Sequence, residues 1–390
     1  MKVFIARTSE VDDKEAALKF ISDQIAAEGS LEKNTVGMLC CHYEFVLSGV
    51  AEYIAKNLPF PVVGTSTTLV GYNGAGNEDD EYNEGQFRLS ITVISSDDIS
   101  FTTVISEPLT PETKADEVCK KQFEEIGKQK LGIMMFPNII LTDFQALLDC
   151  ATTYTKAQIF GGSAVDDSPT YIENCFVFAK GVAYRDRAVF LFMNGNINPH
   201  FSTIVVTKDK YLKGKAIITE ARGNEIISLN GRPVTDFLSS LGFNLTGSKE
   251  NAINSAVMIV DDGDGDEYGR SMMYLTPENH LFVGGNVTTG ATVSVAMFEK
   301  KAVLDASAAS TAEMLAAHPD AKVAFISSCE TRHVLLGSNT FDGENMLRNQ
   351  LGGLPFSLAY AGGEVCPSNA STPENPINRI FNQSYCICMV

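Results

Sequence analysis

The C-terminal part of the chain contains VAFISSCETRH (residues 323–333), FSLAYAGGEVCPS (356–368) and NRIFNQSYCICM (378–389). Each segment holds an apolar, strand-like run that is bounded by small or polar residues. Cys329 and Arg332 follow the first run, Gly362-Gly363-Glu364 follow the second, and Asn382 precedes the third. Buried strands with polar side chains at their ends present chemistry at the rim of a sheet. We therefore expect a binding site at this edge.

The same order of elements occurs three times along the chain: helix, strand, helix, strand ending in small residues, and hairpin. The three strand ends are Gly64-Thr65-Ser66, Gly161-Gly162-Ser163 and Gly362-Gly363-Glu364. Self-similarity of this kind predicts related layers packed around a common centre. In the first unit, Phe87–Ser95 and Phe101–Ile105 flank a short polar turn, so we predict that they pair as a hairpin.

Residues 201–304 do not follow the repeat and are rich in strand patterns and turn signals such as Asn230-Gly231. We predict an α+β (mixed α/β) protein in which mixed β-sheets are layered with helices in an αββα-like arrangement. Two domains are expected, 1–200 and 201–390. The second would combine the β-rich segment 201–304 with an α/β unit at 305–390.

The chain of 390 residues carries 30 Lys and Arg against 48 Asp and Glu, a net charge of −18. This acidity argues against nucleic acid and anionic membranes as partners, because both require a basic surface. No apolar run approaches the roughly 20 residues of a membrane-spanning helix, and the N-terminus MKVFIARTSE lacks signal-peptide features. The nine cysteines are scattered, without a CxxC pair, which predicts buried, reduced thiols in a cytoplasmic protein.

Several short motifs occur in a fixed order along nearly the whole chain. They are Val63-Gly64-Thr65-Ser66-Thr67, Leu89–Ser95, Gly161-Gly162-Ser163-Ala164, Gly231-Arg232-Pro233 with Asp236, Cys329-x-x-Arg332, Gly362-Gly363-Glu364 and Asn382-Gln383-Ser384. In this order and spacing the chain resembles the FIST family (F-box and intracellular signal transduction proteins), as a FIST N plus a FIST C module. Two positions differ from the family pattern: Thr65 replaces a frequent cysteine, and Ser384 replaces a threonine.

The resemblance implies a sensory protein that binds a small ligand such as an amino acid. Because no kinase, cyclase or other output segment follows, we expect a free-standing sensor with a signalling partner in trans. The expected ligand-binding residues lie at the strand ends and would line a pocket between the two modules: Arg332, Glu364, Gly362, Gly363, Cys329, Asn382, Gly161, Gly162, Ser163, Thr65 and Ser66.

The expected roles follow from the side chains, and each has a structural alternative. Arg332 is suited to hold a ligand carboxylate through two hydrogen bonds, and Glu364 to accept from an ammonium group. The two could instead pair with each other or with nearby backbone. Gly161-Gly162-Ser163 suits either a backbone nest for an anion or a tight turn.

A hydrolase and a protein-interaction adaptor are the two alternatives to a sensor. A hydrolase could use Cys329 or Ser163 as nucleophile, but the chain shows no triad order and no nucleophile elbow. A protein-interaction adaptor could use the β-rich segment. We expect no enzyme and no cofactor, since nucleotide-binding glycine patterns and metal-ligand spacings are missing.

Three short segments carry local structural signals. Thr142 and Gln145 have the spacing of a capping box at a helix start. Asp262–Glu267 alternates oxygen-bearing side chains but lacks the glycine and glutamate positions of a calcium loop, so we predict a solvated hairpin turn. Glu78-Asp79-Asp80-Glu81 is predicted to be a solvated acidic loop.

Overall fold

Three mixed β-sheets form the body of the protein, which we define as residues 1–204 and 300–390. The computed structural model describes the whole chain except residues 74–86, 169, 244–254, 264–265 and 340. The first sheet has the order β1 (Lys2–Thr8), β5 (Leu89–Ser96), β2 (Asn34–His42), β3 (Val62–Thr67), β9 (Val177–Ala179) and β10 (Val182–Tyr184). The predicted acidic loop at Glu78–Glu81 lies outside the described residues.

The other two sheets of the body have closely related orders. The second is β24 (Asn378–Phe381), β23 (Glu364–Pro367), β8 (Gln158–Ser163), β7 (Leu131–Phe136), β11 (Val189–Gly195) and β6 (Ile99–Ile105). The third is β12 (His200–Ile204), β25 (Tyr385–Met389), β21 (Ala324–Cys329), β22 (Phe356–Ala361) and β4 (Val70–Asn73).

Each sheet is built around one parallel strand pair: β2 with β3, β7 with β8, and β21 with β22. An antiparallel strand follows on either side of every pair. The second strand of each pair is the one that ends in small residues, as the sequence indicated. The structure therefore confirms the helix–strand–helix–strand part of the predicted threefold repeat.

The predicted pairing of Phe87–Ser95 with Phe101–Ile105 is wrong. β5 pairs with β1 and β2, whereas β6 pairs with β11 in the second sheet. Likewise β9 leaves its own unit to pair with β3, β23 pairs with β8, and β4 pairs with β22. Both edges of β5 are already occupied, so β6 has no edge on which to fold back. Each unit instead completes the sheet of another unit, and the three units interlock.

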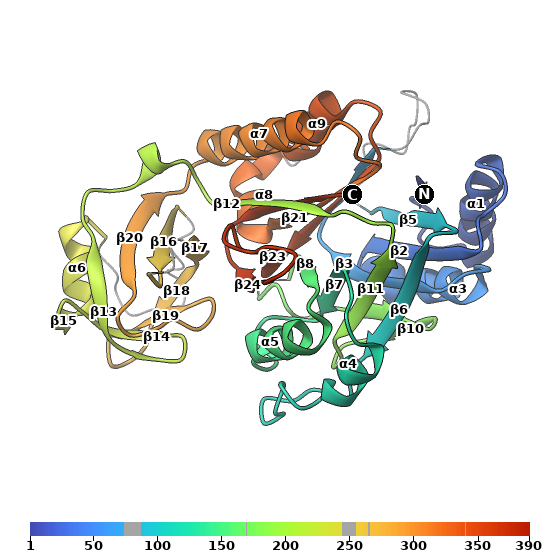
Figure 1. Ribbon diagram of the computed structural model, residues 1–390. Coiled ribbons are helices and arrows are strands. Elements are labelled where there is room, and N and C mark those ends of the chain that lie inside the picture. Colours follow the sequence, from blue (N-terminus) through green and yellow to red (C-terminus); the bar gives the residue numbers. More distant parts are fainter. Residues whose placement is uncertain (74–86, 169, 244–254, 264–265, 340) are drawn as a thin grey trace.

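Helices cover the outer faces of the three sheets, on three sides of the body in Figure 1. The first sheet carries α1 (Lys14–Ala27), α2 (Glu44–Leu47) and α3 (Val50–Asn57); the second carries α4 (Lys120–Ile126) and α5 (Phe144–Thr155); the third carries α7 (Lys300–Ala317), α8 (Glu330–Leu336) and α9 (Asp342–Leu351). The inner faces share a core that includes Val63, Ile133 and Phe325. Two sheets thus face each other with helices outside, as predicted, and a third helix-covered sheet completes a prism.

Residues 205–299, which we call the insert, form a lobe of their own beside the body (Figure 1). Its sheet has the order β17 (Glu267–Arg270), β16 (Ala256–Asp261), β20 (Thr292–Met297), β13 (Ala216–Arg222), β14 (Glu225–Leu229), β19 (Leu281–Val283) and β18 (Met272–Leu275), with β15 (Arg232–Pro233) on β14. The helix α6 (Val234–Ser240) follows β15. The β-rich character predicted for this segment is confirmed. The unit at 305–390 packs in the body, beside residues 1–200.

All nine cysteines lie within the described part of the chain, where they are buried and free of disulfides, as predicted. In the same part of the chain, no helix has the length and apolar character needed to cross a membrane.

Two glycines allow the parallel pairs to pack closely and provide a test of the fold. A Cβ atom at Gly64 would overlap the carbonyl oxygen of Leu39, and one at Gly161 would overlap that of Met134. We expect Gly64→Ala and Gly161→Ala each to lower the free energy of unfolding in urea by about 2–4 kcal/mol. Gly353→Ala is the control, because nothing lies within 4 Å of its Cβ position. Equal stability of all three variants would contradict the strand packing described here.

Candidate functional site

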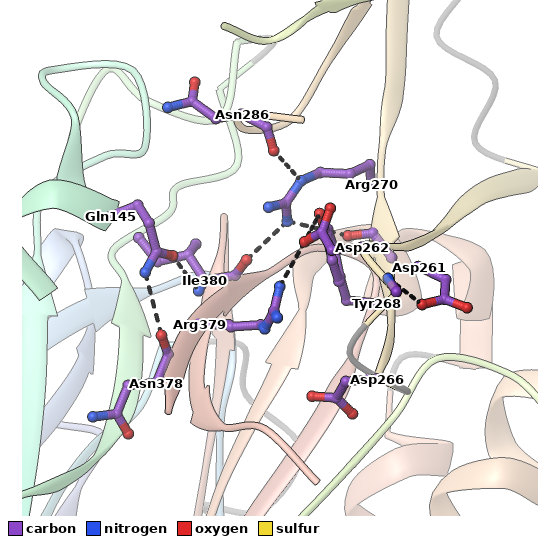
Figure 2. Close-up of polar contacts among 12 residues, drawn as sticks. Gln145, Asp261, Asp262, Asp266, Tyr268, Arg270, Asn286, Asn378, Arg379 and Ile380 are labelled. Atoms are coloured by element: carbon purple, nitrogen blue, oxygen red, sulfur yellow. Dashed lines mark hydrogen bonds and ion pairs between the residues drawn. The ribbon is translucent and has the colours of Figure 1, made fainter. Parts of the chain in front are cut away.

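A cleft of about 600 Å³ lies between the body and the insert. Helix α5 and edge strand β24 form the body side, and β17 and β19 with the following glycine turn form the insert side. Figure 2 shows the polar side chains that meet here. A volume of this size falls in the range of small-molecule sites.

Arg270, at the end of β17, is the buried cation of the cleft, with only 7% of its surface exposed. Its Nε donates to the carbonyl oxygen of Asn286 (3.2 Å), and its Nη1 to those of Gly269 (3.3 Å) and Ile380 (2.8 Å). Among the residues that the structure describes, no carboxylate forms an ion pair with it, and Nη2 makes no hydrogen bond. Burial lowers the pKa of its guanidinium. The site therefore holds a positive charge without a direct counter-ion.

Asp262 is the nearest negative charge on the insert side, but it is already paired. Its Oδ2 accepts from Arg379 Nη1 and from the Tyr268 hydroxyl, both at 2.9 Å. The guanidinium carbons of Arg270 and Arg379 lie 4.5 and 5.0 Å from the centre of the Tyr268 ring. Burial raises the pKa of Tyr268 to about 12, so the phenol stays neutral. The hairpin predicted here is confirmed, because β16 and β17 pair antiparallel, but Asp262 is not simply solvated: it forms a partly buried ion pair. Residues 264–265 lie outside the described residues.

The capping box predicted for Thr142 and Gln145 is also wrong, and Gln145 instead forms part of the cleft wall. Asp143, not Thr142, caps α5 by accepting from the backbone N–H of Ala146. Gln145 instead turns to the edge of β24, where it accepts from the Ile380 N–H (3.0 Å) and donates to the Asn378 carbonyl (3.2 Å). Its amide thus occupies the edge much as a neighbouring peptide would.

Gln145 also connects the edge strand to a carboxyl group of the cleft. Its Nε2 donates to Asp149 Oδ1 at 2.8 Å, and burial raises the pKa of Asp149. Gln145 thus bonds to both Asp149 and the Ile380 N–H, and the carbonyl of the same Ile380 accepts from Arg270. The wall of the cleft thus holds a carboxyl group and a guanidinium that are linked through Gln145 and the backbone of Ile380.

Asn382 lies behind this wall, at the contact between body and insert. A Cβ atom at Gly284 would lie 2.6 Å from Asn382 Oδ1, and one at Gly269 would overlap the Asn382 carbonyl. Gly285 has a φ of +139°, and a Cβ there would lie 3.3 Å from Arg270 Cζ. The three glycines allow Asn382 and Arg270 to pack at this contact. Asn382, expected to bind ligand, is placed between the two lobes and does not line the cleft.

Arg332 projects from α8 into the protein and is only 3% exposed. Nη1 donates to the carbonyls of Val205 (2.7 Å) and Gln383 (3.2 Å), and Nη2 to the Val303 carbonyl (2.7 Å) and Ser307 Oγ (2.8 Å). Burial lowers its pKa to about 10, so it remains charged at neutral pH. These bonds join the start of the insert, α7 and the turn before β25.

Glu364 and Cys329 lie in the same buried region as Arg332. Glu364 is fully buried; its Oε2 accepts from Ser384 N (3.1 Å) and Ser384 Oγ (2.6 Å), while Oε1 has no hydrogen-bond partner among the described residues. Burial raises the pKa of this carboxyl well above its usual value. Burial, and then the charge of Glu364, also raise the pKa of the Cys329 thiol. The structure brings these three predicted residues together, but away from the cleft.

The other predicted residues meet at the centre of the body, as their repeat pattern indicated. Thr65, Gly161, Gly162 and Ser163 line a second, smaller cavity of about 70 Å³ between the three sheets. Gly362-Gly363 packs beside it, where the Gly363 carbonyl accepts from Ser163 N at 2.9 Å. Ser66 Oγ accepts from the Phe176 N–H. These Ser163 and Ser66 bonds are internal to the protein.

The sequence analysis missed the residues that surround the larger cleft: Gln145, Asp149, Arg270 and Arg379. Gln145 was assigned to a helix cap, and the other three were not singled out. A usable signal was the clustering of Gly269-Arg270 and Gly284-Gly285 within a β-rich segment, since glycines inside strands often mark close backbone approach.

A prism of three interlocked sheets with a large cleft beside a β-rich insert defines a two-lobed α+β protein. The model of the FIST N domain matches residues 35–232, and that of the FIST C domain matches residues 238–367. The chain belongs to the FIST family, whose domains are associated with signal transduction. A search of curated proteins found no match.

Arg332 provides a test of the buried contacts. Arg332→Ala removes the donor for three backbone carbonyls and one hydroxyl, and we expect it to lower the free energy of unfolding by about 3 kcal/mol or more. Arg222→Ala is the control, because its side chain is 72% exposed. Urea titration measures both variants. A loss below about 1 kcal/mol for Arg332→Ala would show that these bonds contribute little.

The carboxyl of Glu364 leads to a prediction about pH. Because its folded pKa is raised, its contribution to stability is complete below the unfolded pKa of about 4.3 and is lost as pH rises towards the folded value. Glu364→Gln removes this titration. From pH 5 upwards we expect the wild type to lose about 1.4 kcal/mol per pH unit relative to Glu364→Gln, until the folded carboxyl ionises.

Urea unfolding at pH 5, 6, 7 and 8 measures this difference. Glu313→Gln, at an exposed position of α7, is the control and should show no such slope. A stability difference between wild type and Glu364→Gln that does not change with pH would mean that Glu364 titrates normally.

Proposed function

We propose that this FIST protein is a cytoplasmic sensor that binds a small carboxylate-bearing ligand, such as an amino acid, in the cleft between body and insert. The observation that carries the proposal is Arg270, a buried guanidinium on the cleft wall without an ion-pair partner among the described residues. A ligand carboxylate would supply the missing charge and accept from Nη2. The resulting charge-assisted hydrogen bond would exclude ligands without an acidic group.

Two further features suit an amino acid. Asp149 is linked to Arg270 through Gln145 and the backbone of Ile380, so a carboxyl group is available for an ammonium group. Phe144, Met273 and Phe282 add apolar surface to the same cleft. The cleft, at about 600 Å³, is also large enough for ligands bigger than a single amino acid.

Ligand binding would act on the relative position of the two lobes. Ile380 donates its backbone N–H to Gln145 of α5 and accepts at its carbonyl from Arg270 of the insert, so the backbone of one residue contacts both walls. A ligand that touches both walls binds the closed arrangement more tightly and shifts the population towards it. A signalling partner in trans would recognise this change.

Binding rather than catalysis is supported by the two candidate nucleophiles. The Cys329 thiol is buried and its pKa is raised, which disfavours the reactive thiolate. Ser163 Oγ is buried and has no hydrogen-bond partner among the described residues, whereas a nucleophilic serine needs a base. Arg332 is not proposed as a ligand-binding residue, because it donates to four protein acceptors.

Thermal shift followed by isothermal titration with amino acids and small carboxylic acids tests the proposal. We expect at least one of these compounds to stabilise the protein in a saturable manner. Arg270→Gln should weaken its binding by about 10- to 100-fold, since a hydrogen bond to a charged group contributes about 1.5–3 kcal/mol. Arg222→Gln, which changes an exposed arginine of the same lobe, should bind as the wild type does.

Circular dichroism establishes that each variant is folded, and Arg270→Lys tests whether charge without the planar guanidinium suffices. Binding that survives in Arg270→Gln would place the ligand outside this cleft. If no compound binds, while a protein partner is captured equally by wild type and Arg270→Gln, the adaptor hypothesis replaces the sensor.

A further inference from the structure

The smaller cavity at the centre of the body shares no lining residue with the cleft. It has a volume of about 70 Å³ and lies where the inner faces of the three sheets meet. We propose that this cavity is a second ligand site, and that it takes a small uncharged molecule with an oxygen atom capable of hydrogen bonding. Short alcohols and ketones have this chemistry.

Small residues create the hollow within an otherwise close-packed core. Ala359 and Ala361 of β22 and Gly161 and Gly162 of β8 leave space between larger neighbours. The packing at its edge is tight: a Cβ atom at Gly162 would lie 2.9 Å from both Ala361 Cβ and Ser327 Oγ. Because the residues at the edge of the cavity are in such close contact, the cavity does not result from loose packing of the whole core.

The lining excludes charged ligands. Of the described residues that surround the cavity, none is Asp, Glu, Lys, Arg or His. The Cys40 thiol has a pKa raised by burial to about 12 and is therefore neutral. An ion placed here would lose its hydration without a compensating charge, at a large cost in free energy.

The hydroxyl groups of three serines, Ser163, Ser327 and Ser357, give the cavity polar character, and the buried Ser163 Oγ makes no hydrogen bond with a described residue. Ser327 is only 4% exposed, and neither Ser327 Oγ nor Ser357 Oγ makes a hydrogen bond with a described residue. Thr65 adds a further hydroxyl, which donates to the Ser66 carbonyl at 3.2 Å. A buried hydroxyl without a partner is unfavourable, so an oxygen atom of the ligand would satisfy Ser327.

The volume limits the size of the ligand. One water needs roughly 10–15 Å³ of such space, and an apolar cavity of about 150 Å³ holds benzene. The central cavity, at about 70 Å³, lies between these limits. It fits a molecule of roughly three to five non-hydrogen atoms, or one xenon atom.

Two methionines allow a direct test, because Met38 and Met135 line this cavity whereas Met273 lines the cleft. The full-length protein is labelled at the methionine methyl groups with ¹³C and titrated with 2-propanol, or placed under xenon pressure. We expect saturable shifts of the Met38 and Met135 signals with both probes, and no saturable shift of Met273. The same shifts should persist in Arg270→Gln, which separates this site from the proposed function of the cleft.

Two variants test the chemistry. Ser327→Ala should weaken 2-propanol binding by about 5- to 10-fold and leave xenon binding unchanged, because only the alcohol uses the hydroxyl. Ala359→Val should abolish the shifts with both probes by filling the space. Shifts that are linear in probe concentration, or that persist in Ala359→Val, would overturn the proposal and leave a cavity that holds water only.

Discussion

Backbone pairing at the edges of the three parallel strand pairs is the constraint on which the rest of the structure depends. A parallel pair leaves N–H and C=O groups exposed on both sides, and in a packed core these groups must find partners. Here β9, β23 and β4 supply one edge of each pair, and all three come from other units. Stability is therefore shared among the units, and no unit contains its complete sheet.

This exchange also positions the cleft. Because β23 and β24 lie in the second sheet, the C-terminal part of the chain passes α5 before it returns to the third sheet as β25. The turn at Asn382-Gln383 is packed against Gly269 and Gly284 of the insert. The contact between body and insert thus depends on a turn of the C-terminal segment, which is more than 90 residues away in sequence from the insert residues that it touches.

The two buried arginines, Arg332 and Arg270, show that burial alone does not identify an arginine as a ligand-binding residue. Arg332 and Arg270 are 3% and 7% exposed, and burial lowers the pKa of both. Arg332 uses both terminal nitrogens on protein acceptors, whereas Arg270 uses Nε and Nη1 and faces an open cleft. The difference lies in the partners supplied by distant segments, which the sequence around either arginine does not reveal.

The sequence by itself determined the α+β class, the threefold helix–strand–helix–strand repeat, the β-rich insert and the burial of the cysteines. These follow from local patterns of apolar residues, glycines and turns, which depend on near neighbours. Only the tertiary structure decided that β6 leaves β5, that Gln145 covers an edge strand, and that Asp262 forms an ion pair. The physical reason is that a strand edge or a side chain bonds to whichever partner the fold brings near, and these partners are more than a hundred residues away for Gln145 and Asp262.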